Sequence, residues 1–277
     1  MREVLERGDL RLGFERTGAE GDPTVLVHGG WEDGRAWERV VPGLSSSLQV
    51  LVYDRRGHGS SSSASPGPPV RKDASDLAQL LESTGLFPAH VLALGEGGTI
   101  ALRLAVDRPE LVRSVAVHEI PSATLLDLEV PSSEERGRFV RAVERLRGLV
   151  GAGQGEEAAR GYLEAFAAPA EQWSLLDDGA RRYLRSHAEA WSREMADPEA
   201  FGLSLAELRG LAIPVLSTTG GSSPGFARRI DDRLADAVGN GTSLHLSDGG
   251  HFVHRTDPDL YVGVLGGFLL ERNVPTT

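Results

Sequence analysis

The stretch from His90 to Leu102 constrains the fold of this chain more than any other feature. It begins with the apolar run from Val91 to Leu94, passes through three glycines within residues 95–98, and continues with residues typical of a helix. A short, wholly apolar run predicts a strand that is covered on both faces, as in a parallel sheet. Glycines at its end allow the chain to turn sharply and approach the strand closely. We therefore predict a strand, a tight turn and a helix.

A nucleophile elbow has this arrangement, with the serine of a G-x-S-x-G motif at the strained turn between strand and helix. Ala93 and Gly97 supply the small residues on either side, and Gly95 stands where the nucleophile is expected. A frame shifted by two residues would put Gly97 in that position and Thr99 where a small residue is needed. Neither frame provides a hydroxyl, thiol or carboxylate nucleophile. The question of function becomes what such a turn does without one.

Strand and helix patterns alternate along most of the remaining chain. Apolar runs predict an N-terminal hairpin and later strands, at residues 2–17, 24–27, 50–53, 114–121, 212–218 and 242–246. Residues 122 to about 204 carry helical spacing instead, including the aromatic stripe with Tyr162 and Phe166, for which we expect a packing role. The pattern predicts an α/β fold with a mostly parallel central sheet covered by helices. We assign residues 1–121 and 205–277 to the core and residues 122–204 to an inserted helical cap.

The amino-acid composition restricts the kinds of partner that this protein can bind. The formal net charge of −11 argues against nucleic acid or an anionic membrane as a partner, because both require clustered positive charge. No stretch approaches the roughly 20 apolar residues of a membrane span, and the first residues lack the apolar segment of a signal peptide. We therefore expect a cytoplasmic protein that acts on a small molecule as a monomer or homodimer.

The sequence offers no pattern for a metal or cofactor. It contains no cysteine, which excludes disulfides, thiolate metal sites and a cysteine nucleophile. The eight histidines are scattered, without the paired spacing of a metal-binding helix. The sequence Gly95-Glu96-Gly97 begins like the G-x-G-x-x-G motif of a dinucleotide-binding turn, but the last glycine of that motif is absent. We therefore expect a protein that works without a metal or cofactor.

Four motifs together resemble the α/β-hydrolase fold over essentially the whole chain. They are the loop His28-Gly29-Gly30-Trp31, the loop from Asp54 to Gly59, the elbow, and Gly249-Gly250-His251. In this family the nucleophile, acid and histidine follow in that order along the chain. The resemblance implies that His251 is the catalytic histidine. It also implies an oxyanion hole made by the backbone N–H of Glu96 and one from Gly30 or Trp31, while His28 is expected to hold its loop by hydrogen bonds.

The acid is identified by a narrower resemblance. The usual position, after the strand at 212–218, carries no carboxylate within residues 219–223. Glu119 fits an alternative position, after the strand that follows the elbow helix, which some haloalkane dehalogenases and zearalenone-lactonase-like enzymes use. The stretch beginning at His118 is similar to that of these lactonases, and Trp191 matches their substrate-contacting lid tryptophan. This resemblance implies a Glu119–His251 pair, with His118 and Trp191 in substrate binding.

Our leading hypothesis is hydrolysis of an ester or lactone of an apolar or aromatic molecule by water that His251 activates directly, with Glu119 holding the imidazole. It requires no acyl-enzyme at Gly95. A second hypothesis is a non-hydrolytic acid/base enzyme (an isomerase, epimerase, cyclase or lyase) with Glu96 as a second acid/base group. A third is a protein that keeps the pocket and only binds its ligand. A fourth is a serine hydrolase silenced by an introduced glycine.

Overall fold

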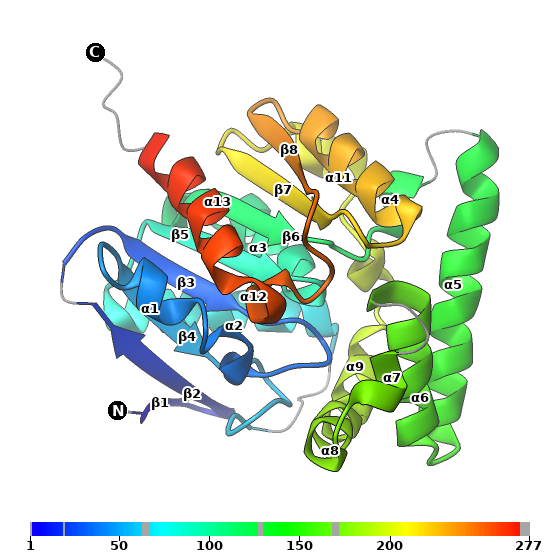
Figure 1. The fold of residues 1–277 in the computed structure, drawn as a ribbon. Helices are drawn as coiled ribbons and strands as arrows, with labels where there is room; N and C mark the ends of the chain where they lie inside the picture. Colours follow the sequence, from blue (N-terminus) through cyan, green and yellow to red (C-terminus); the bar gives the residue numbers. More distant parts are fainter. Residues whose placement is uncertain (1, 19, 63–66, 127–129, 168–171, 272–277) are drawn as a thin grey trace.

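The computed structural model describes residues 2–18, 20–62, 67–126, 130–167 and 172–271 (Figure 1). These residues form an eight-stranded sheet with the order β1-β2-β4-β3-β5-β6-β7-β8. The strands are β1 (Arg2–Arg7), β2 (Leu10–Thr17), β3 (Pro23–Val27), β4 (Gln49–Tyr53), β5 (Ala89–Leu94), β6 (Val112–His118), β7 (Val215–Gly220) and β8 (Gly241–Leu246). The pairs β1–β2 and β2–β4 are antiparallel, and all other neighbours are parallel. The predicted mostly parallel sheet is confirmed.

Helices lie between the strands and in the insert. They are η1 (Gly34–Trp37), α1 (Val41–Leu44), α2 (Pro69–Thr84), α3 (Glu96–Asp107), η2 (Pro109–Leu111), α4 (Ala123–Leu126), α5 (Val130–Gly151), α6 (Gly155–Tyr162), the π-helical turn η3 (Leu163–Ala167), α7 (Gln172–Leu175), α8 (Asp178–Ser186), α9 (Ala188–Glu194), η4 (Pro198–Phe201), α10 (Leu205–Arg209), α11 (Gly225–Ala237), α12 (Val253–Thr256) and α13 (Pro258–Glu271). Within the described ranges, no helix combines the length and apolar character needed to cross a membrane.

Apolar side chains fill both faces of the sheet. Alternate residues of one strand point to opposite faces, so Val25 and Val27 of β3 join one core cluster and Leu26 joins the other. The first cluster includes residues of α2, α3 and α11, and the second includes Trp37, Tyr261 and their neighbours on α1 and α13. This double burial explains why the central strands are continuous apolar runs and not alternating ones.

Helices α5 to α9 form the inserted cap between β6 and β7, and Figure 1 shows them grouped at one side of the sheet. Helix α9 packs against α2 of the core and against α5, α6 and α8 of the insert. The carboxyl ends of parallel strands meet at one sheet edge, which is where ligands bind in open α/β sheets. The loops after β3, β5, β6 and β8 carry the predicted site residues to this edge.

Candidate active site

Gly95 keeps the backbone conformation of a nucleophile elbow. It lies between β5 and α3 with φ 48° and ψ −123°, in a region that glycine adopts more readily than other residues. Its N–H donates to the carbonyl of His118 at 2.9 Å. A Cβ atom at Gly95 would meet only the Gly29 Cα at 3.9 Å, so the space for a side chain is still present. The turn therefore has room for a Cβ atom at the position where the sequence analysis expects a nucleophile.

Gly97, two residues later, is glycine for a packing reason. A Cβ atom there would lie 2.5 Å from the carbonyl oxygen of His28, a backbone atom that cannot move aside. We predict that Gly97→Ala lowers the free energy of unfolding in urea by about 3 kcal/mol. Gly95→Ala, the matched control, is expected to cost only about 1 kcal/mol for its left-handed backbone. Equal losses in the two variants would contradict this account of the elbow.

Glu119 and His251 form the pair that the sequence predicts. His251 Nδ1 lies 2.8 Å from one carboxylate oxygen of Glu119, and the other oxygen accepts the Gly220 N–H at 2.8 Å and the Ser223 hydroxyl. The predicted strand 114–121 ends early, at His118, because Glu119 adopts a left-handed backbone with φ 52°. This sharp turn redirects the chain at the acid position, and the usual acid position contributes Ser223 as a hydrogen-bond donor.

The charges of this pair are set by burial and by mutual contact. Burial acts to raise the pKa of Glu119, but His118, His251 and the Ser223 hydrogen bond outweigh it and lower the pKa to about 2. Burial acts to lower the pKa of His251, but the hydrogen bond and charge of Glu119 raise it above its usual 6.5. Glu119 is therefore an ionised acceptor at neutral pH, which fixes the proton of neutral His251 on Nδ1 and leaves Nε2 as a base.

Tyr162 of the cap occupies the other side of that imidazole. Its hydroxyl lies 2.9 Å from His251 Nε2 and donates to it, since Nδ1 holds the ring proton. Burial raises the pKa of Tyr162 well above 10, so the hydroxyl stays protonated. The helical spacing predicted only packing for this residue, and nothing in the spacing signals a polar contact with His251. The tyrosine hydroxyl makes the hydrogen bond that a serine at an elbow makes to its histidine.

The predicted oxyanion hole is partly filled by the protein itself. The Gly30 N–H donates to one carboxylate oxygen of Glu96 at 2.8 Å, and the Trp191 indole N–H donates to the other at 2.8 Å. The resemblance implied that the Gly30 N–H could serve the oxyanion hole, but this N–H is already bonded to Glu96. The Glu96 N–H begins α3, and the first N–H groups of a helix have no acceptor within it. The Trp31 ring stacks on Tyr162, with ring centroids 5.0 Å apart.

A narrow pocket of about 30 Å³ lies between these groups and the cap. Polar side chains of Glu96, Glu119, Tyr162 and His251 line one part of it, together with Gly95. The rest is apolar and largely aromatic, with Ile120, Pro121, Phe139, Val143, Phe166, Trp191, Met195, Phe226 and Ala227. The pocket thus combines a few convergent polar groups with an apolar wall, as small-molecule sites do.

Comparison with known proteins identifies the fold family. The sequence model of the α/β hydrolase fold matches residues 22–258. The chain belongs to the α/β hydrolase fold family. It is 27% identical over 257 residues to the magnesium-chelatase 30 kDa subunit of Rhodobacter capsulatus, a match that covers 89% of this chain and 86% of that protein.

Two further proteins are similar to this chain, one over part of its length and one over nearly all of it. The chain is 32% identical over 108 residues to the dihydrolipoyllysine-residue acetyltransferase component of the acetoin cleaving system of Cupriavidus necator, covering 39% of this chain and only 29% of that relative. Est816, described as an N-acyl homoserine lactone degrading enzyme, superposes with a TM-score of 0.74 at 21% identity, over 96% of this chain and all of its own. At that identity the likeness shows the shared fold.

His118, for which the lactonase resemblance implied substrate binding, lines the smaller space that adjoins the main pocket and not the main pocket itself. Its side chain is buried, with Nδ1 2.9 Å from the Thr218 hydroxyl and Nε2 3.2 Å from the Gly250 carbonyl. Burial lowers its pKa to about 4, so the ring is neutral. Since both ring nitrogens contact the protein, His118 ties β6 to β7 and to the loop that carries His251.

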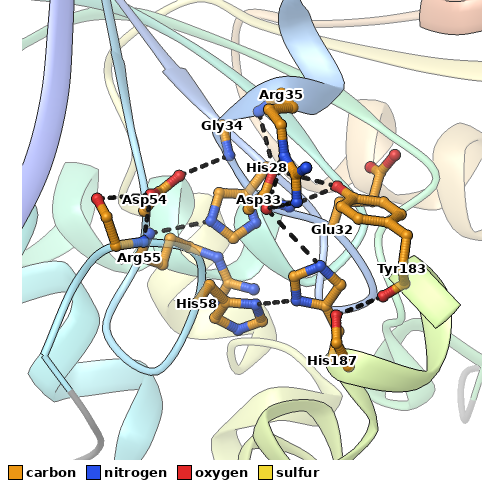
Figure 2. A network of polar contacts seen from close by, with 12 residues as sticks. His28, Glu32, Asp33, Gly34, Arg35, Asp54, Arg55, His58, Tyr183 and His187 are labelled. Atoms are coloured by element: carbon orange, nitrogen blue, oxygen red, sulfur yellow. Dashed lines mark hydrogen bonds and ion pairs between the residues drawn. The ribbon is translucent and has the colours of Figure 1, made fainter. Parts of the chain in front are cut away.

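His28 holds its loop as predicted, accepting the Arg55 N–H at Nε2 at a distance of 2.9 Å. Beside it, a buried polar network joins the cap to the core of this hydrolase fold (Figure 2). His58 Nε2 contacts the Glu194 carboxylate of α9 at 2.8 Å, and its Nδ1 lies 3.3 Å from His187 Nδ1. These contacts fix α9, and with it Trp191, relative to the loops after β3 and β4.

Asp33 extends this network to α8. Its N–H donates to the Tyr183 hydroxyl at 3.0 Å, and that hydroxyl donates back to the Asp33 carboxylate at 3.2 Å. Figure 2 shows Tyr183 and His187 converging on Asp33 from the cap. Over the part of the chain that the structure describes, no three His, Cys, Asp or Glu side chains are grouped to hold a metal ion.

Proposed function

We propose that this protein hydrolyses an ester or lactone of an apolar or aromatic small molecule, using water activated by His251 as the nucleophile. The Glu119–His251 hydrogen bond at 2.8 Å, beside an elbow that holds glycine, carries the proposal. A histidine oriented by an ionised carboxylate is a competent general base without a neighbouring serine. The pocket walls match an apolar acyl or alcohol group.

In the proposed reaction, water displaces the Tyr162 hydroxyl from His251 Nε2. The imidazole takes one proton from the water while the water oxygen bonds to the substrate carbonyl carbon, which gives a tetrahedral oxyanion. The Glu96 N–H, the Trp31 N–H and the Tyr162 hydroxyl are the proposed donors to this oxyanion, because the Gly30 N–H donates to the Glu96 carboxylate. Collapse breaks the carbon–oxygen bond, and His251 returns the proton to the leaving alkoxide.

The proposal predicts a pH dependence with a definite sign. Only neutral His251 accepts a proton, so kcat/KM should rise with pH and level off above the pKa of His251, which lies above 6.5. Below that midpoint the rate should fall about tenfold per pH unit. Glu119 remains ionised throughout because its pKa is about 2. Initial rates between about pH 5 and 9 test this, and a flat profile, or one that falls as pH rises, would contradict the base role.

Activity itself is tested with a panel of aryl esters, acyl homoserine lactones and macrocyclic aromatic lactones. Acyl homoserine lactones are included because Est816, of the same fold, is described as degrading them. The native chain, His251→Ala and Gly95→Ser are compared by mass spectrometry of products. Turnover by the native chain that His251→Ala abolishes supports the proposal. Turnover by Gly95→Ser alone would show a silenced serine hydrolase, and turnover by neither would leave ligand binding as the function.

One observation favours a second candidate, a non-hydrolytic proton-transfer enzyme. The Glu96 carboxylate and His251 line the same pocket, so two groups could exchange protons with one substrate. Incubating carbonyl compounds with the protein in deuterium oxide distinguishes the candidates. Deuterium entering recovered substrate at a carbon next to the carbonyl, lost in Glu96→Gln, would favour proton transfer, whereas cleavage products without such exchange favour hydrolysis.

A further inference from the structure

Glu96 is a buried carboxylate whose hydrogen-bond donors are both uncharged. Its side chain is 7% exposed, and its partners are the Gly30 backbone N–H and the Trp191 indole N–H. Within the described ranges, no arginine, lysine or histidine nitrogen lies within 4.0 Å of its oxygens. A carboxylate removed from water is costly unless a positive charge accompanies it. The protein does not supply that charge in contact with Glu96.

Two neighbouring carboxylates show the usual solution. Glu119 contacts His251, and Glu32 contacts His254 at 3.1 Å and Arg255 at 3.0 Å. Both are buried like Glu96, and both have basic partners on the loop and helix after β8. Glu96 also lines the pocket, but neither of its hydrogen-bond partners carries a charge. The missing partner is therefore expected to come from the pocket side.

The surroundings of Glu96 suit a cation. The rings of Tyr162 and Trp191 line the pocket together with Glu96, and both pack against Trp31 with centroid separations of 5.0 and 5.1 Å. Ring faces attract ammonium groups, most strongly where water is excluded. The described residues that line the main pocket and the smaller adjoining space include Glu32, Glu96 and Glu119 and no lysine or arginine.

We propose that this pocket binds an organic ammonium group, with Glu96 as its counter-ion and the rings of Tyr162 and Trp191 beside it in the pocket wall. That this ligand is also a substrate rests on the proposed function. The substrate is then an ester or lactone that bears an amine or quaternary ammonium group. Such a substrate also offsets the charge of Glu96 next to the developing oxyanion. A neutral ligand of the same shape leaves the carboxylate uncompensated and binds more weakly.

The test compares two ligands of nearly equal shape, 3-hydroxyphenyltrimethylammonium and 3-tert-butylphenol, by calorimetric titration of the native full chain. We expect the cation to bind at least tenfold more tightly. Glu96→Gln should weaken the cation at least tenfold and leave the neutral probe unchanged, which also reports that the pocket is intact. Glu189→Gln, an exposed residue on α9, is the control for the same change in net charge.

Equal affinity of the native protein for the two probes would overturn the inference without any variant. So would a Glu96→Gln variant that still binds the neutral probe and keeps its preference for the cation. If Glu96→Gln binds neither probe, Glu96→Asp is used instead, because it keeps the charge. We expect Glu96→Asp to keep the preference for the cation. Loss of that preference would contradict the counter-ion role. Binding is measured without turnover, so cation selectivity without hydrolysis would refute the proposed function alone, and hydrolysis without cation selectivity would refute this inference alone.

Discussion

Replacing Glu119 by glutamine is expected to lower kcat/KM by about 10⁴-fold, because a neutral amide does not enforce the imidazole tautomer that leaves Nε2 free. The equivalent change in Ser-His-Asp proteases has an effect of about this size. The carboxylate also raises the pKa of His251, so the pH midpoint of any residual activity should move down. Steady-state rates across the pH range measure both effects.

Ser223→Ala is the matched control for Glu119→Gln. It removes one hydrogen bond to the Glu119 carboxylate while keeping its charge and the Gly220 N–H contact. We expect a loss of about tenfold, since a single hydrogen bond to a charged group contributes roughly 1.5 kcal/mol at the lower end of its range. If glutamine at position 119 reduced the rate no more than Ser223→Ala does, the carboxylate would not be orienting the base.

Replacing Tyr162 by phenylalanine is expected to lower kcat by about 10²- to 10³-fold with little change in KM, because it removes a donor to the oxyanion. The ring remains, so its stacking on Trp31 and the shape of the pocket should persist. Tyr183→Phe is the control, since that cap hydroxyl contacts Asp33 and not His251. An increase in kcat on Tyr162→Phe would show instead that this hydroxyl only blocks the base.

The sheet, the approximate positions of its strands and the elbow could be predicted from the sequence, because each depends on local patterns of apolar residues and glycines. The apolar pattern predicts an end of β6 at residue 121, whereas the strand ends at His118, because Glu119 takes a left-handed backbone that the pattern does not signal. The Glu119–His251 contact was anticipated through resemblance, and its catalytic role stays a prediction.

The hydrogen bonds of the Tyr162 and Glu96 side chains could not be predicted from the sequence. Tyr162 meets His251 across 89 positions of the chain, and Glu96 meets Gly30 across 66. The Tyr162 contact depends on how the cap is placed on the core, which Asp33, His58 and Glu194 help to fix, whereas the Glu96 contact with Gly30 lies within the core itself. Helical periodicity predicts which face of a helix is buried, and it does not predict which polar group that face meets.

Direct attack by water is tested most directly by a single turnover with enzyme in excess in H₂¹⁸O, using a substrate identified from the panel. We predict that the first acid product carries one ¹⁸O atom and that the quenched native protein keeps its unmodified mass, while Gly95→Ser provides the reference for an acyl adduct. Unlabelled acid from the first turnover, which indicates attack by a carboxylate, or an acyl adduct on the native protein, would contradict the account.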